Sequence, residues 1–179
     1  MTAVRRYTMN LDTLNKYRDK SAFVEEVKRK SFEMEVNSHG CSQVVVQTFL
    51  DVFEEDNLPL FMAASPFAAG MSLTGHNCGA LIGGLMVLGT VFGRQHVKDG
   101  MPGILKDIRP MRKLVKYFDG THGTVNCRDI TRTDLADPGK SEAFFNNGGL
   151  EKCAGIISEV CGMVAELLYD EKCARDRKE

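Results

Sequence analysis

The chain has 179 residues, 43% of them hydrophobic, which is enough for one domain with a substantial core but short for two. A formal net charge of −1 gives no indication of nucleic acid or an anionic membrane as a partner. Six cysteines are too few, at this length, for a scaffold held by disulfides. We therefore expect a single domain over residues 1–179 that binds neither nucleic acid nor a membrane.

The N-terminus carries two adjacent arginines, Arg5 and Arg6, without an apolar segment behind them. Secretory and twin-arginine signals both require further features that are missing here, so we expect no leader and a cytoplasmic location. In a reducing compartment, several cysteines indicate metal or redox chemistry more often than structural disulfides.

The first third of the chain predicts two helices joined near Gly40. An amphipathic helix ending near residue 40 is indicated by residues that recur at the helical period, namely Phe23, Val27, Ser31 and Met34. A second helix is expected to begin at Cys41. A short apolar helix over residues 60–64 and a glycine-rich loop over residues 70–75 follow.

Residues 78–93 are nearly all apolar and include five glycines. The segment is short for a membrane span, so we expect a central helix buried on all sides. Gly79 and Gly83 share one face, as do Gly89 and Gly93, and each pair lets a neighbour approach closely. Glycine costs about 1 kcal/mol per helical site relative to alanine, so these glycines need a reason. Helix packing is one reason, and contact of Gly79 and Gly83 with a cofactor is another.

The second half predicts two more long helices. An amphipathic helix is expected over residues 104–118, closed by Asp119-Gly120. Residues 121–137 read as a polar, turn-rich segment ending in an Asp137-Pro138-Gly139 turn. A regular apolar stripe over residues 150–167 predicts the last helix, with residues 170–179 as a charged, fraying tail. Without any strand pattern, the fold class is an all-α, single-domain helical bundle with a buried glycine-rich central helix.

The cysteines are the candidate functional residues. Cys41 and Cys78 each follow a histidine by two residues and begin an apolar run. The free N–H groups and the dipole at a helix N-terminus favour the thiolate. Cys127 lies beside Arg128, and Cys153 lies on the apolar face of the last helix. Any one of these cysteines could be a small hydrophobic residue without a function. Together they indicate a metal or cluster site, or a thiol redox site.

Spacing limits how the cysteines combine. Cys161 lies about 12 Å along the helix axis from Cys153, so the two do not share one metal ion. Cys173 lies in the charged tail, where we expect no function. Three histidines precede cysteines and would complete a mixed site for zinc or an iron cluster, or serve as caps and surface residues: His39, His76 and His122. His96 is expected at the surface. No Cys-x-x-Cys is present, so distant segments must form any site.

One pattern joins four of these cysteines. Cys78-Gly79-Ala80 with Gly83, in order with Cys41, Cys127 and Cys153, resembles the signature of the C-GCAxxG-C-C family of redox-active proteins, related to the split-Soret cytochromes. The resemblance extends over about residues 38–168. It implies a helical fold, a redox role and a homodimer. The split-Soret relatives carry an iron–sulfur centre and covalent haem, but the haem-attachment motif is missing here, so we expect no covalent haem.

Three functions follow as hypotheses. The favoured one is an iron–sulfur protein that uses Cys41, Cys78, Cys127 and Cys153 as metal ligands and carries electrons to or from a redox partner. The second is a thiol–disulfide protein with Cys41 and Cys78 as the exchanging pair. The third is a non-catalytic protein, either with a structural zinc site, for which His39 and His76 are the mixed-ligand candidates, or simply with a helical core that contains cysteines.

Overall fold

A computed structural model describes residues 9–177, and within this range the chain forms helices and no strand. The all-α prediction is confirmed. Arg5 and Arg6 lie outside the described residues. The helices are α1 (Lys20–Ser38), α2 (Cys41–Phe53), α3 (Leu58–Ala64), α4 (Ala68–Met71), α5 (Gly79–Phe92), α6 (Gly100–Lys106), α7 (Arg109–His122), α8 (Cys127–Thr131), α9 (Pro138–Phe144) and α10 (Leu150–Asp176). Short 3-10 turns are η1 (Leu11–Lys16), η2 (Ser65–Phe67) and η3 (Val97–Asp99), and a π-helical turn, η4 (Phe145–Gly149), leads into α10.

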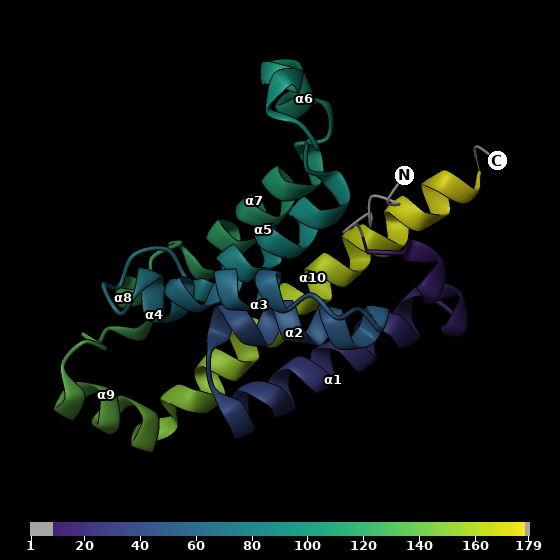
Figure 1. Cartoon of the computed structure of the whole chain (residues 1–179). Coiled ribbons are helices and arrows are strands. Elements are labelled where there is room, and N and C mark those ends of the chain that lie inside the picture. The colour runs from purple at the N-terminus through teal and green to yellow at the C-terminus, as the bar shows by residue number, and fades with distance from the viewer. Residues whose placement is uncertain (1–8, 178–179) are drawn as a thin grey trace.

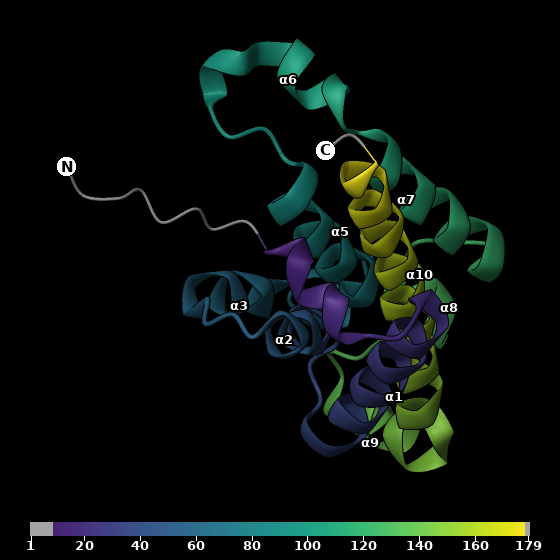
Figure 2. The ribbon, with the colours of Figure 1, turned by 90° about the vertical axis from the view of Figure 1, so that its right-hand side faces the viewer.

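The long helix α10 runs along α1, and α2 and α5 pack against each other to complete the core (Figures 1 and 2). The side chains that are fully buried come from several helices and form one cluster: Phe23, Phe49, Phe118, Ile157 and Leu168. The predicted helix starts at Cys41 and near Cys78 are confirmed. None of the helices in residues 9–177 has the length and apolar character that crossing a membrane requires.

Helix α5 is not buried on all sides, contrary to the prediction. Gly79 and Gly84 face neighbouring helices closely, but Ile82, Leu85 and Met86 are only half-buried. The prediction for the second glycine pair is also wrong. A Cβ at Gly89 would meet no atom within 4 Å, and the residue four positions on, Gly93, lies beyond the helix as its C-cap.

The helix expected over residues 104–118 is broken in two. Helix α6 ends at Lys106 and α7 begins at Arg109, with Pro110 in its first turn. Proline lacks an N–H and restricts the residue before it, so it suits a helix start and interrupts a continuous helix. Helix α7 then continues through Gly120 to His122. As Figure 1 shows, α6 stands away from the other helices on the connection between α5 and α7.

Two further boundaries differ from the predictions. Asp137-Pro138 begins α9 instead of forming a turn, because the Asp137 side chain accepts a hydrogen bond from the N–H of Lys140 and caps the helix. Helix α10 continues to Asp176 where a fraying tail was expected. Ion pairs four residues apart, such as Arg175–Glu171 at 2.8 Å, support its last turns.

Candidate functional site

Four of the six cysteines line one cavity of about 110 Å³, which we call the cysteine cavity. They are the four that the sequence singled out: Cys41, Cys78, Cys127 and Cys153. One water molecule needs roughly 10–15 Å³, so the cavity has room for a group of several atoms. Most other lining side chains are apolar, including Ala69, Ala80, Ile130, Leu135, Ile156 and Ile157. The cavity therefore combines soft sulfur donors with a largely apolar lining.

Each of these cysteines lies at or near the beginning of a helix. Cys41 and Cys127 are the first residues of α2 and α8, and Cys78 is the N-cap of α5. Cys153 lies in the first turn of α10. Cys127 and Cys153 therefore lie at helix starts as well, like Cys41 and Cys78, and four separate helices supply one thiol each.

Gly79 brings Cys41 next to Cys78. A Cβ at Gly79 would collide with the Sγ of Cys41 and lie 2.7 Å from the carbonyl oxygen of Phe67. At Gly83 a Cβ would lie 2.7 Å from the carbonyl oxygen of Ser42. Both glycines therefore allow α5 to approach the start of α2, as the packing alternative predicted. Neither is among the residues that line the cysteine cavity.

A backbone bridge places Cys78 beside Cys127. Asn77 and Asn126 form an isolated antiparallel bridge. The N–H of Cys78 donates to the carbonyl of Val125 at 2.8 Å, and the N–H of Cys127 donates to the carbonyl of His76 at 2.7 Å. Two segments almost fifty residues apart in sequence are thereby fixed side by side.

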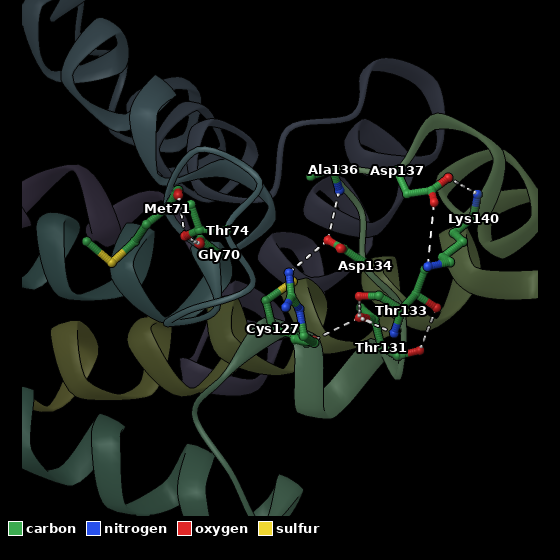
Figure 3. A network of polar contacts seen from close by, with 11 residues as sticks. Gly70, Met71, Thr74, Cys127, Thr131, Thr133, Asp134, Ala136, Asp137 and Lys140 are labelled. Atoms are coloured by element: carbon green, nitrogen blue, oxygen red, sulfur yellow. Dashed lines mark hydrogen bonds and ion pairs between the residues drawn. The ribbon is translucent and has the colours of Figure 1, made fainter.

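The segment after Cys127 is held by its own polar contacts (Figure 3). The hydroxyl of Thr131 donates to the carbonyl of Cys127 at 2.9 Å. Arg128 pairs with Asp134 at 2.8 Å. Burial raises the pKa of Cys127, and the positive charge of Arg128 offsets only part of that rise.

Cys153 completes the group, whereas Cys161 does not join it. The ammonium of Lys152 donates to the carbonyl of Ile130 at 2.7 Å, which ties the start of α10 to α8. Cys161 is fully buried in the core, where the Ser31 hydroxyl faces its thiol. Cys153 and Cys161 thus lie in different surroundings, in keeping with their spacing along the helix. Cys173 also lies outside the cavity.

The expected low thiol pKa values are wrong. Burial raises the pKa of Cys41 to about 12 and those of Cys78 and Cys127 to about 11, and it raises that of Cys153 as well. Backbone N–H groups at the helix starts do act toward the thiolate, among them that of Ala80 at Cys78, but their effect is smaller. These thiols hold their protons at neutral pH unless a metal cation replaces them.

Glu35 also lines the cysteine cavity, and the sequence reasoning missed it. Its side chain is buried, with 4% of the residue exposed, and burial raises its pKa to about 7. Among the described residues its Oε2 has no hydrogen-bond partner. A signal was available: Phe23, Val27, Ser31 and Glu35 follow one another at four-residue spacing, so a carboxylate occupies the buried stripe of α1.

The histidines contribute less than the cysteines. His39 lines the cavity from an exposed position, while His76 and His122 do not line it, and His96 is exposed as predicted. The Nε2 of His122 lies 3.5 Å from a carboxylate oxygen of Glu159. Within residues 9–177, no three His, Cys, Asp or Glu side chains are arranged to hold a single metal ion.

The fold and the cavity define a class of protein: it is all-helical, and the N-terminal ends of four helices place one thiol each in a largely apolar cavity. A family model described as "Putative redox-active protein (C_GCAxxG_C_C)" matches residues 39–167, and the chain belongs to this family. The resemblance seen in the cysteine pattern is confirmed, and with it the redox character by which the family is described. No curated protein and no solved structure matches the chain.

Proposed function

We propose that the cysteine cavity binds an iron–sulfur cluster and that the protein transfers electrons to or from a redox partner. The observation that carries the proposal is the lining of one cavity by Cys41, Cys78, Cys127 and Cys153. Cysteine thiolates are the usual ligands of such clusters, four of them in the common types. When bound, a cluster supplies one-electron oxidation and reduction.

The arrangement supports a cluster more than a single zinc ion. The four sulfurs around zinc must converge on one point at about 2.3 Å. The thiolates of a cluster bind different iron atoms, so their sulfurs lie further apart. Four thiols share a cavity of about 110 Å³, which has room for a group with several metal atoms.

The backbone around the thiols suits a negatively charged cluster. The N–H groups of Ser42 and Ala69 act toward the thiolate form of Cys41, and those of Ala80 and Leu81 do so for Cys78. Hydrogen bonds to ligand sulfurs tune the potential of a cluster, and helix starts stabilise negative charge. In this proposal the chain holds the cluster within a largely apolar lining and offsets its charge.

Anaerobic reconstitution tests the proposal. Protein purified without oxygen is incubated with ferrous iron and sulfide, and its iron content, sulfide content and visible spectrum are measured. We expect a brown protein with several iron atoms per chain. Cys78→Ala removes a cavity thiol and should lose the cluster, whereas Cys173→Ala is the matched control and should keep it. Wild-type protein that retains less than one iron atom per chain would overturn the proposal.

A thiol–disulfide function is the second candidate, because the sulfur of Cys41 lies against Gly79, the neighbour of Cys78. The raised pKa values of both thiols weaken it, since the thiolate is the reactive form. Mild oxidation of the metal-free protein followed by peptide mass spectrometry tests it. A Cys41–Cys78 disulfide that forms reversibly supports this function, and its absence after full oxidation excludes it.

A further inference from the structure

Glu35 is the only carboxylate among the described residues that line the cysteine cavity, and it is 4% exposed. The N–H of Gly40 faces its carboxyl group, but Oε2 has no hydrogen-bond partner among the described residues. No lysine or arginine is among the lining residues. A buried carboxyl oxygen without a hydrogen-bond partner has lost its contact with water and has no protein contact that replaces it. A metal or other group bound in the cavity would supply that contact.

We propose that Glu35 is an oxygen ligand of the metal bound in the cysteine cavity. The inference depends on the proposed function, because it assigns an additional donor to the same cluster. One iron would take the carboxylate oxygen in addition to a cysteine thiolate, and the other irons would be bound by thiolates alone. Protons displaced from the thiols and the carboxyl leave to solvent as the metal binds, and no oxidation or reduction is involved.

The chemistry of the ligand set supports this assignment. Thiolates are soft donors and carboxylate oxygen is a harder one, so an oxygen-bound iron differs electronically from its thiolate-bound neighbours. The position also fits. Glu35 reaches the cavity from the C-terminal part of α1, whereas the four cysteines enter from the starts of four other helices. The carboxylate thus comes from a fifth helix, α1, and adds a donor to the four cysteine thiols.

The test compares wild-type protein with Glu35→Gln after reconstitution with ⁵⁷Fe and sulfide. Glutamine keeps the size of the side chain and the oxygen that faces Gly40, but it is a much poorer iron ligand. Mössbauer spectra distinguish irons by their ligands, and release of iron to a chelator reports affinity. We expect a distinct iron population in the wild type that disappears in Glu35→Gln, and iron release faster by about tenfold or more.

Glu33→Gln is the matched control, because Glu33 is exposed on the same helix and pairs with Arg29 at 2.7 Å. It should leave spectrum and iron release unchanged. Identical spectra and release rates in Glu35→Gln and the wild type would overturn the role of Glu35 while the cluster stands. Failure of the wild type to take up iron would instead overturn the proposed function itself, and the ligand role with it.

Circular dichroism checks that the glutamine variant folds. Should its helix content fall, Glu35→Asp takes its place, because it keeps the carboxylate but shortens its reach by one methylene. The iron population assigned to the oxygen ligand should then shift or weaken. An unchanged spectrum in a folded Glu35→Asp protein, with iron release at the wild-type rate, would overturn the assignment.

Discussion

Helix α10 presents two cysteines to two different surroundings. Cys153 faces the cysteine cavity with three other thiols, and Cys161, two turns later, is fully buried beside Ser31. Burial raises the pKa of both thiols. Cys153 is half-buried and Cys161 fully buried, yet the direction of the pKa shift is the same, so a raised pKa does not separate a candidate functional cysteine from a core cysteine in this protein. What separates them is the presence of other donors in the same chamber.

Removing each thiol in turn gives the largest expected contrast. Cys153→Ala should abolish cluster binding, because it removes one of the four thiolate ligands. Cys161→Ala should keep the full iron content and lower the free energy of unfolding by about 1 kcal/mol, as is common for a small core truncation. Iron analysis and urea unfolding measure the two effects. Loss of iron in the Cys161 variant, at unchanged helix content, would contradict the distinction.

Alkylation of the metal-free protein compares the cavity thiols with a thiol near the C-terminal end of α10. At pH 8, iodoacetamide should modify Cys173 first. Only the thiolate reacts, and pKa values of about 12 for Cys41 and about 11 for Cys78 leave at most about one in a thousand of these thiols ionised at pH 8.

The same experiment carries a pH dependence. Since pH 8 to 10 lies below both raised pKa values, each pH unit should speed the modification of Cys41 and Cys78 roughly tenfold. Peptide mass spectrometry at successive times gives the rates. Modification of the cavity thiols as fast as that of Cys173 at pH 8 would argue for the thiol–disulfide function.

The raised pKa of Glu35 predicts that the stability of the metal-free protein depends on pH. Its pKa is about 7 in the folded protein against an ordinary value of 4.5, so between these values the folded chain holds a proton that the unfolded chain releases. The free energy of unfolding of the metal-free protein should therefore fall as pH rises from about 4.5 to 7, by up to about 1.4 kcal/mol per pH unit. Glu35→Gln should lack this fall, and Glu33→Gln should keep it. Urea unfolding at several pH values measures the difference, and parallel curves for wild type and Glu35→Gln would refute it.

The sequence predicted the local features of the site and missed those that depend on tertiary contacts. The helix starts at Cys41 and Cys78 were predictable because an apolar run begins at each. Their convergence was not, because it depends on contacts such as the Asn77–Asn126 bridge and the Lys152–Ile130 hydrogen bond. The family pattern grouped the four cysteines, but only the fold shows that they line one cavity.

The errors in the predicted helices have physical reasons. Pro110 marks a helix start, and the apolar spacing on either side of it concealed the break. Asp137-Pro138 suits both a turn and a helix N-terminus, and the residues that follow decide between them. Glu35 could have been found from its four-residue spacing with Ser31, but the direction of its carboxyl group toward the cavity could not.

The two ends of α5 provide a matched pair of glycines. Gly79→Ala should lower the free energy of unfolding by about 1–3 kcal/mol, because its Cβ would collide with the Sγ of Cys41 and the backbone of Phe67. Gly89→Ala places the same methyl group where no atom lies within 4 Å, and it should raise stability by up to about 1 kcal/mol through helix propensity. Urea unfolding of both variants measures the two changes in stability.

The collision also moves Cys41 relative to Cys78, so Gly79→Ala should lose iron as well. A Gly79→Ala protein that is as stable as Gly89→Ala and binds as much iron would contradict this prediction. It would show that the close approach of α2 and α5 does not position these two thiols.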